Sequence, residues 1–117
     1  MLALSAGTKV FLAAGATDLR RSIDGLSLLV AAQLELDPLS GHLFVFCNRR
    51  RTIVKILYWD RNGFALWQKR LEKQYFIWPE VDAEVLEVGI RELTWLLEGL
   101  HIKQQNAHRE LRYSSVL

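Results

Sequence analysis

The chain has 117 residues, half of them hydrophobic, and its fifteen Lys and Arg against thirteen Asp and Glu give a net charge of +2. This size fits one compact domain that needs neither disulfides nor metal, and the single cysteine, Cys47, excludes an intramolecular disulfide and favours a reducing compartment. No apolar run is long enough for a membrane span, and Lys9 interrupts the N-terminal run, so we expect a soluble cytoplasmic protein with no membrane partner.

The first forty residues predict a strand followed by a helix. The apolar run Lys9–Ala14 ends at Gly15 and is typical of a short strand. Thr17 and Asp18 then offer side-chain oxygens that can cap the first turn of a helix. Apolar residues follow at spacings of three and four and share one helix face. They are Leu19, Ile23, Leu26, Leu29, Val30 and Leu34. We expect a long helix that ends before Asp37-Pro38.

From residue 42 to residue 78 the pattern changes to strands. Four runs rich in β-branched and aromatic residues are separated by short polar links. These runs are His42–Cys47, Thr52–Asp60, Phe64–Leu71 and Tyr75–Trp78. Asn62-Gly63 is a strong hairpin signal, because both residues tolerate a positive φ. The segment therefore predicts an antiparallel β-meander.

The predicted turns fix a register and two sheet faces. Turns centred on Arg49-Arg50 and on Asn62-Gly63 place Cys47 opposite Thr52, Val45 opposite Val54, and Tyr58 opposite Trp67. One face then carries Leu43, Val45, Val54, Ile56, Tyr58 and Trp67, and the other carries Phe44, Phe46, Ile53, Leu57, Trp59, Phe64 and Leu66. Both faces are apolar, so one helix cannot cover the sheet. The second face must meet another helix, a second subunit or a ligand.

The C-terminal third predicts a second, shorter helix. Residues 84–88 fit either a short strand or the approach to that helix, and Ile90–Glu98 is helical with Gly99 as its stop. The predicted fold class is α+β: an antiparallel β-meander of about four to five strands, with a long N-terminal helix and a shorter C-terminal helix. We expect residues 1–102 to form a single compact domain, and residues 103–117 to form a loosely ordered polar tail.

No group of residues predicts an enzyme, a metal site or a cofactor. The three histidines lack metal-ligand spacing, and Cys47 lies in an apolar run where it serves packing. Asp18 and Asp60 fit a helix cap and a turn, and the acids of residues 80–87 fit a solvated surface. A divalent-metal nuclease that uses Asp18 and Asp60 is retained as an alternative, but no motif supports it.

The basic residues are unevenly distributed and predict a surface for nucleic acid. Residues 42–78 carry eight basic side chains against two acids, whereas residues 79–100 carry one against six. Arg49, Arg50 and Arg51 lie at one hairpin tip and Arg61 at the next turn, while Lys69, Arg70 and Lys73 lie where the third strand of the meander returns toward that tip. Such a patch would bind phosphates in a salt-dependent way.

Aromatic residues of the meander suggest a further contribution to binding. Trp59, Phe64 and Trp67 are close enough in the predicted sheet to stack on bases. Each feature also has an ordinary structural explanation. Tryptophans in a sheet usually belong to the core, and arginines at a turn often serve only solubility.

Several runs resemble the small accessory protein, often called TnpB, of insertion-sequence-66-type bacterial elements. They are FLAAGATDLRRSIDGLSLLV, LFVFCNRRRTIVKILYWDRNGFALWQKRLE and WLLEGL, within residues 9–100. The resemblance implies a protein encoded beside a larger transposase and needed for efficient transposition, without the strand-transfer active site. It brings no catalytic residue, and the motif positions that it transfers, Thr17–Arg20, Asn48–Arg50 and Tyr58–Asp60, carry no assigned role.

Two hypotheses about function follow. The first is a non-catalytic accessory factor that binds DNA at the element ends through phosphate contacts of the basic residues. The second is a protein-interaction module, which docks on the cognate transposase or self-associates as a homo-oligomer through the apolar sheet face or the C-terminal helix.

Overall fold

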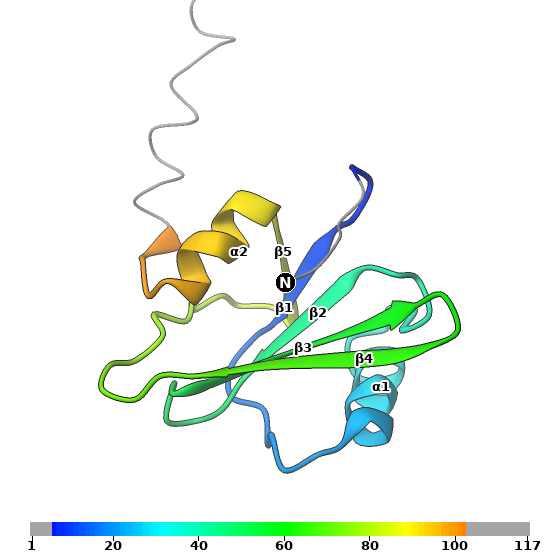
Figure 1. The fold of residues 1–117 in the computed structure, drawn as a ribbon, viewed down its shortest axis with the longest axis horizontal. Helices are drawn as coiled ribbons and strands as arrows, with labels where there is room; N and C mark the ends of the chain where they lie inside the picture. Colours follow the sequence, from blue (N-terminus) through cyan, green and yellow to red (C-terminus); the bar gives the residue numbers. More distant parts are fainter. Residues whose placement is uncertain (1–5, 103–117) are drawn as a thin grey trace, which may run out of the picture.

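The computed structural model of the chain describes residues 6–102 as a five-stranded sheet with a helix on each side (Figure 1). The strands are β1 (Val10–Ala13), β2 (Leu43–Cys47), β3 (Ile53–Asp60), β4 (Gly63–Arg70) and β5 (Val85–Val88), and the helices are α1 (Ile23–Ala32) and α2 (Ile90–Leu97). The α+β class is confirmed. The tail predicted for residues 103–117 lies outside the described residues.

The sheet is mixed, which corrects the expectation of a purely antiparallel meander. Its strand order is β4-β3-β2-β1-β5, and β1 runs parallel to β2 while the other pairs are antiparallel. These two strands are parallel because α1 lies between them in the chain. The helix returns the chain to the end of the sheet where β1 began, and β2 starts there. Residues 84–88, for which two alternatives were open, contain the strand β5.

The predicted strand Tyr75–Trp78 is absent. This segment instead crosses one face of the sheet, where Phe76 and Trp78 are buried. The Trp78 indole Nε1 donates a hydrogen bond of 3.1 Å to the carbonyl oxygen of Ala13. Packing against the sheet therefore overrides the high β-propensity of this run.

The observed register differs from the predicted one by two residues in each hairpin. Cys47 pairs with Val54 rather than Thr52, and Trp67 pairs with Ile56 rather than Tyr58. Because side chains alternate with a period of two, a shift of two residues leaves every side chain on its predicted face. The division of the meander into two apolar faces is therefore correct although the pairing was wrong.

Both faces of the sheet are covered within the described residues. On one face, α1 packs through Leu26, Leu29 and Val30 against a core that includes Phe44, Phe46 and Leu57. On the other, α2 and the segment with Phe76 and Trp78 cover a second core. Its strand residues are Val10, Leu12, Leu43, Val45, Cys47, Val54 and Ile56. Figure 1 shows the two helices on opposite sides of the sheet. The second face was expected to meet another helix, a second subunit or a ligand, and in the structure it meets another helix.

Helix α1 is shorter than predicted. It starts at Ile23 rather than near Thr17, because Asp18 caps a local turn in which its Oδ1 accepts the Arg20 N–H at 3.1 Å. It ends at Ala32, and Glu35 with a φ of 56° turns the chain away. The second helix agrees closely with its prediction, with Gly99 at a φ of 86° as its stop. Neither helix has the length and apolar character needed to cross a membrane.

Helix α1 offers a matched pair of leucines to test its packing. Leu26 is fully buried whereas Leu28 is 66% exposed. We expect Leu26→Ala to lower the free energy of unfolding by about 2–5 kcal/mol, through lost burial and the cavity left behind. Leu28→Ala in the same helix should change it by no more than about 0.5 kcal/mol. Urea unfolding followed by circular dichroism measures both, and equal losses would contradict the assigned face of α1.

Candidate nucleic-acid interface

The turn between β2 and β3 is built around the side chain of Asn48. Its Oδ1 accepts hydrogen bonds from the backbone N–H groups of Thr52 (2.9 Å) and Ile53 (3.0 Å), and its Nδ2 donates to Thr52 Oγ1 (3.1 Å). These bonds hold the loop of residues 48–52 in one shape. Arg49 and Arg50 are exposed at its tip, and neither side chain has a hydrogen bond or ion pair within residues 6–102.

Arg51 differs from its two neighbours because it is tied into the fold. Its guanidinium donates to the carbonyl oxygen of Gly15 at 3.2 Å and lies 6.0 Å from the centre of the Trp78 ring. Its own carbonyl oxygen accepts the Phe76 N–H at 2.8 Å. Arg51 is half-buried and joins three segments of the chain. We therefore assign it a structural role, and its predicted contact with nucleic acid is untested.

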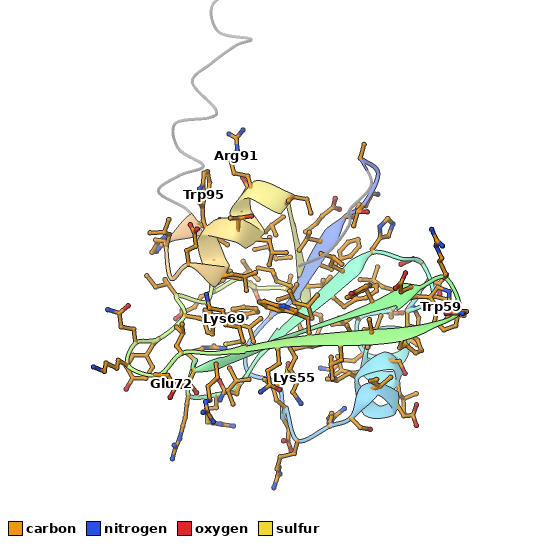
Figure 2. The ribbon with its side chains drawn as sticks, viewed as in Figure 1. Lys55, Trp59, Lys69, Glu72, Arg91 and Trp95 are labelled. Carbon is orange, nitrogen blue, oxygen red and sulfur yellow. The ribbon has the colours of Figure 1, made fainter. Side chains whose placement is uncertain are left out.

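The predicted return of Lys69 and Arg70 toward the tip is confirmed by the register, which pairs them with Val54 and Ile53. The two side chains then diverge to opposite faces. Lys69 Nζ donates to the Leu97 carbonyl oxygen at the end of α2 (2.7 Å), whereas Arg70 forms an exposed ion pair with Glu72 (3.2 Å). Figure 2 shows Lys69 on the α2 side of the sheet and Lys55 on the other side. Lys69 stabilises α2 through the favourable position of a cation at a helix C-terminus.

Arg61 does not lie at this tip, because the β3–β4 turn is at the opposite end of the sheet. Lys73 is exposed in the link after β4, at the same end of the sheet as the tip. Trp59 and Phe64 make an edge-to-face contact at 5.1 Å near Arg61, while Trp67 packs into the core on the α2 face. In Figure 2, Trp59 and Glu72 mark the two ends of the sheet. The three aromatic residues form no shared platform, and base stacking by them is untested.

The loop between β1 and α1 adds a second wall beside the tip. The Thr17 N–H donates to the Cys47 carbonyl oxygen at 2.8 Å, and Lys55 Nζ donates to the Leu19 carbonyl oxygen at 2.7 Å. Between this loop and the tip lies a surface hollow of about 550 Å³, which we call the basic hollow. It is lined by Ala16, Thr17, Asp18, Leu19, Arg20, Asn48, Arg49, Arg50, Ile53, Lys55 and Gln68.

An ion pair occupies the rim of the basic hollow opposite Arg49 and Arg50. Arg20 Nε lies 2.9 Å and its second guanidinium nitrogen 2.7 Å from the Asp18 carboxylate oxygens. The hydrogen bonds from the Arg20 side chain, and next those from its backbone, hold the pKa of Asp18 well below its usual range. Asp18 stays ionised, and its charge is balanced by Arg20 rather than facing an incoming anion alone.

Part of this site was missed by reasoning on the sequence. Arg20, Lys55 and Gln68 line the hollow although none was predicted as a binding residue. The available signal was the resemblance, whose motif positions Thr17–Arg20 and Asn48–Arg50 meet here. The alternative nuclease pair is not brought together, since Asp18 lies beside the β2–β3 turn and Asp60 ends β3 at the far side.

Other candidate chemical groups lie apart from the hollow. Within residues 6–102, no group of three or more His, Cys, Asp or Glu side chains is placed to hold a metal ion. Cys47 is fully buried in β2, and this burial raises the pKa of its thiol. A thiol in that position packs rather than reacts.

The chain is similar to one protein family and to individual relatives. A family model described as IS66 Orf2 like protein matches residues 8–107. Two proteins of Sinorhizobium fredii, the uncharacterized proteins y4hO and y4jC, are 35% and 36% identical to the chain over 100 residues. These alignments cover 86% of this chain and 87% and 86% of the two relatives. No solved structure matches the chain significantly.

The ion pair on the rim predicts an unusual titration of one carboxyl group. With Arg20 in place, the side-chain carboxyl of Asp18 should stay ionised from about pH 5 down to about pH 3, where an ordinary aspartate becomes protonated. Its pairing therefore stabilises the fold at ordinary pH and is lost only as the pH falls through the lowered pKa. In Arg20→Gln the midpoint should rise toward about 3.9.

Carboxyl-detected NMR of Asp18 measures this titration. Arg21→Gln is the matched control, because Arg21 contributes the last and smallest of the causes that lower this pKa. Identical titration curves for the wild type and Arg20→Gln would show that the ion pair is not formed in solution.

Proposed function

The chain belongs to the IS66 Orf2-like family, and from this premise we propose that it is a non-catalytic accessory protein that binds DNA through the basic hollow. Family membership associates the chain with the transposition of insertion sequences, and its role in that process is an accessory one. Binding to DNA is the finer statement that we add. The observation that carries it is the pair of free guanidinium groups of Arg49 and Arg50 on the rim of the hollow.

Charge and exposure support phosphate as the ligand of this rim. An arginine that has no partner within the protein can offer two parallel donors to a phosphate without breaking an existing bond. The fixed shape of the Asn48 turn lowers the entropy that these two arginines lose on binding. Contacts of this kind would hold DNA in place and carry little sequence information.

The absence of catalysis in our proposal rests on the chemistry of the hollow. Among the described residues that line it, Asp18 is the one carboxylate, and Arg20 holds both of its oxygens. A carboxylate paired in this way is a weak base, because its pKa is lowered well below the neutral range. The proposal therefore assigns Asp18 and Arg20 to binding and shaping the rim, with the chemical steps of transposition left to another protein.

The proposal predicts which arginines matter for binding. Arg49→Ala with Arg50→Ala should weaken binding to a duplex from the element end by about ten-fold or more at moderate salt. It should also reduce the slope of log affinity against log salt by about 2, since two phosphate contacts are lost. Fluorescence anisotropy at several salt concentrations gives both quantities.

As a control, a second double variant removes two positive charges from parts of the protein outside the hollow. Arg61 lies at the far end of the sheet and Arg91 lies on the outer side of α2 (Figure 2). Arg61→Ala with Arg91→Ala should leave the affinity within about two-fold and the slope nearly unchanged. If both double variants weaken binding equally, net charge rather than the hollow governs the interaction.

Protein assembly is a second candidate function, and the free edge of β4 favours it. This eight-residue strand ends the sheet, and no described residue pairs with its outer side. Alternate backbone N–H groups of β4 therefore point outward, which is the arrangement that accepts an added strand. The cognate transposase and a second copy of this chain are the two partners that we propose for it.

Hydrogen exchange on the full chain tests this assembly. With the transposase added, or at high protein concentration, the outward amides of Phe64, Leu66, Gln68 and Arg70 should become protected. The amides on the free edge of β5 are the control and should not change. A protein that stays monomeric in light scattering and is not retained by immobilised transposase would exclude this function.

A further inference from the structure

We infer that the basic hollow receives one unpaired nucleotide of a DNA strand, so that the protein binds DNA with an unpaired base in preference to intact duplex. This inference rests on the proposed function, because it assumes that the hollow binds DNA, and it adds which form of DNA is bound. The size, the floor and the rim of the hollow carry the argument.

The size of the hollow fits a small ligand rather than a duplex. Its volume of about 550 Å³ lies within the range of sites that enclose small molecules. A duplex keeps its bases inside the stack, so the face of a paired base cannot enter this hollow. A base that is already unpaired can leave the helix at little cost and enter the hollow.

The floor of the hollow has the chemistry that a base requires. Ala16, Leu19 and Ile53 contribute apolar groups, and the stem of Lys55 extends this surface because its ammonium group is held by the Leu19 carbonyl. An unpaired base that covers these groups removes apolar surface from water on both sides. Binding to the floor would therefore be favourable for any of the four bases.

The Gln68 side chain is a polar group of the hollow that remains available to the edge of a base. The Gln68 side chain is exposed and forms no hydrogen bond with any residue in the described part of the chain. The Asn48 amide, by contrast, is used within the turn. Gln68 can donate and accept at once, which suits the edge of a base that has lost its pairing partner.

The rim completes the arrangement on both sides of the floor. Arg49 and Arg50 stand on the side of the β2–β3 turn, and Arg20 stands on the side of the loop before α1. A strand that placed one base on the floor would bring the phosphates on either side of that nucleotide to these guanidinium groups. A blunt duplex would reach the rim alone, and this difference is the source of the expected preference.

The experiment compares three labelled DNAs: a blunt duplex, the same duplex with a single-nucleotide bulge, which adds only one phosphate, and a single strand with as many phosphates as the blunt duplex. Anisotropy titrations of the full chain at one salt concentration should show about ten-fold tighter binding to the bulged duplex and to the single strand than to the blunt duplex. Equal affinity for all three would overturn the inference and leave the proposed function standing. No binding to any of them would remove both.

Two substitutions assign the preference to the hollow itself. Ala16→Trp places a large side chain over the floor and should abolish the preference for DNA with an unpaired base. The control is Ala83→Trp, since Ala83 is exposed away from the hollow. Gln68→Ala should reduce the preference several-fold, whereas Gln74→Ala should not. A preference that survives both hollow substitutions in folded protein would place the unpaired base elsewhere and overturn the inference.

Discussion

The central constraint on this fold is that its sheet is apolar on both faces and must be covered twice. All five residues of β2 are buried, and they alternate between the core beneath α1 and the core beneath α2. A short chain meets this demand by placing one helix on each side and drawing the segment with Phe76 and Trp78 across the α2 face. With both faces enclosed, turns and sheet edges supply much of the surface left for recognition.

Because both faces are enclosed, the position of a basic residue in the sheet decides whether its side chain is bound within the protein or free. Lys55 and Lys69 emerge on opposite faces, and each ammonium group donates to a backbone carbonyl oxygen. Arg49 and Arg50 lie beyond the strands and keep their donors free. Charges that are equivalent in the sequence therefore differ in availability, and only position in the fold separates cations that support the structure from cations that can bind.

The sequence was informative wherever a local pattern decides the outcome. The two faces of the meander were predicted correctly despite a wrong register, because alternation tolerates a shift of two residues. The predicted start of α1 was wrong, because the Asp18 carboxylate takes part in a local turn and in an ion pair instead of capping the helix. The second wall of the hollow depends on the bond from Thr17 to Cys47, a contact across thirty residues that no short pattern reveals. The hairpin tip was therefore predictable, and the hollow beside it was not.

The difference between Arg51 and its neighbours Arg49 and Arg50 has a consequence at the level of the cell. The Arg51 side chain donates to the Gly15 carbonyl and lies over Trp78, so its loss weakens the contact between the loop after β1 and the segment that covers the α2 face. Chaperones and proteases convert a small loss of stability into a lower steady-state abundance. Substitution of Arg51 would thus reduce the number of molecules, whereas under the proposed function substitution of Arg49 or Arg50 would weaken DNA binding by each molecule. A genetic screen that scores transposition frequency alone would merge these two phenotypes, and immunoblotting would separate them.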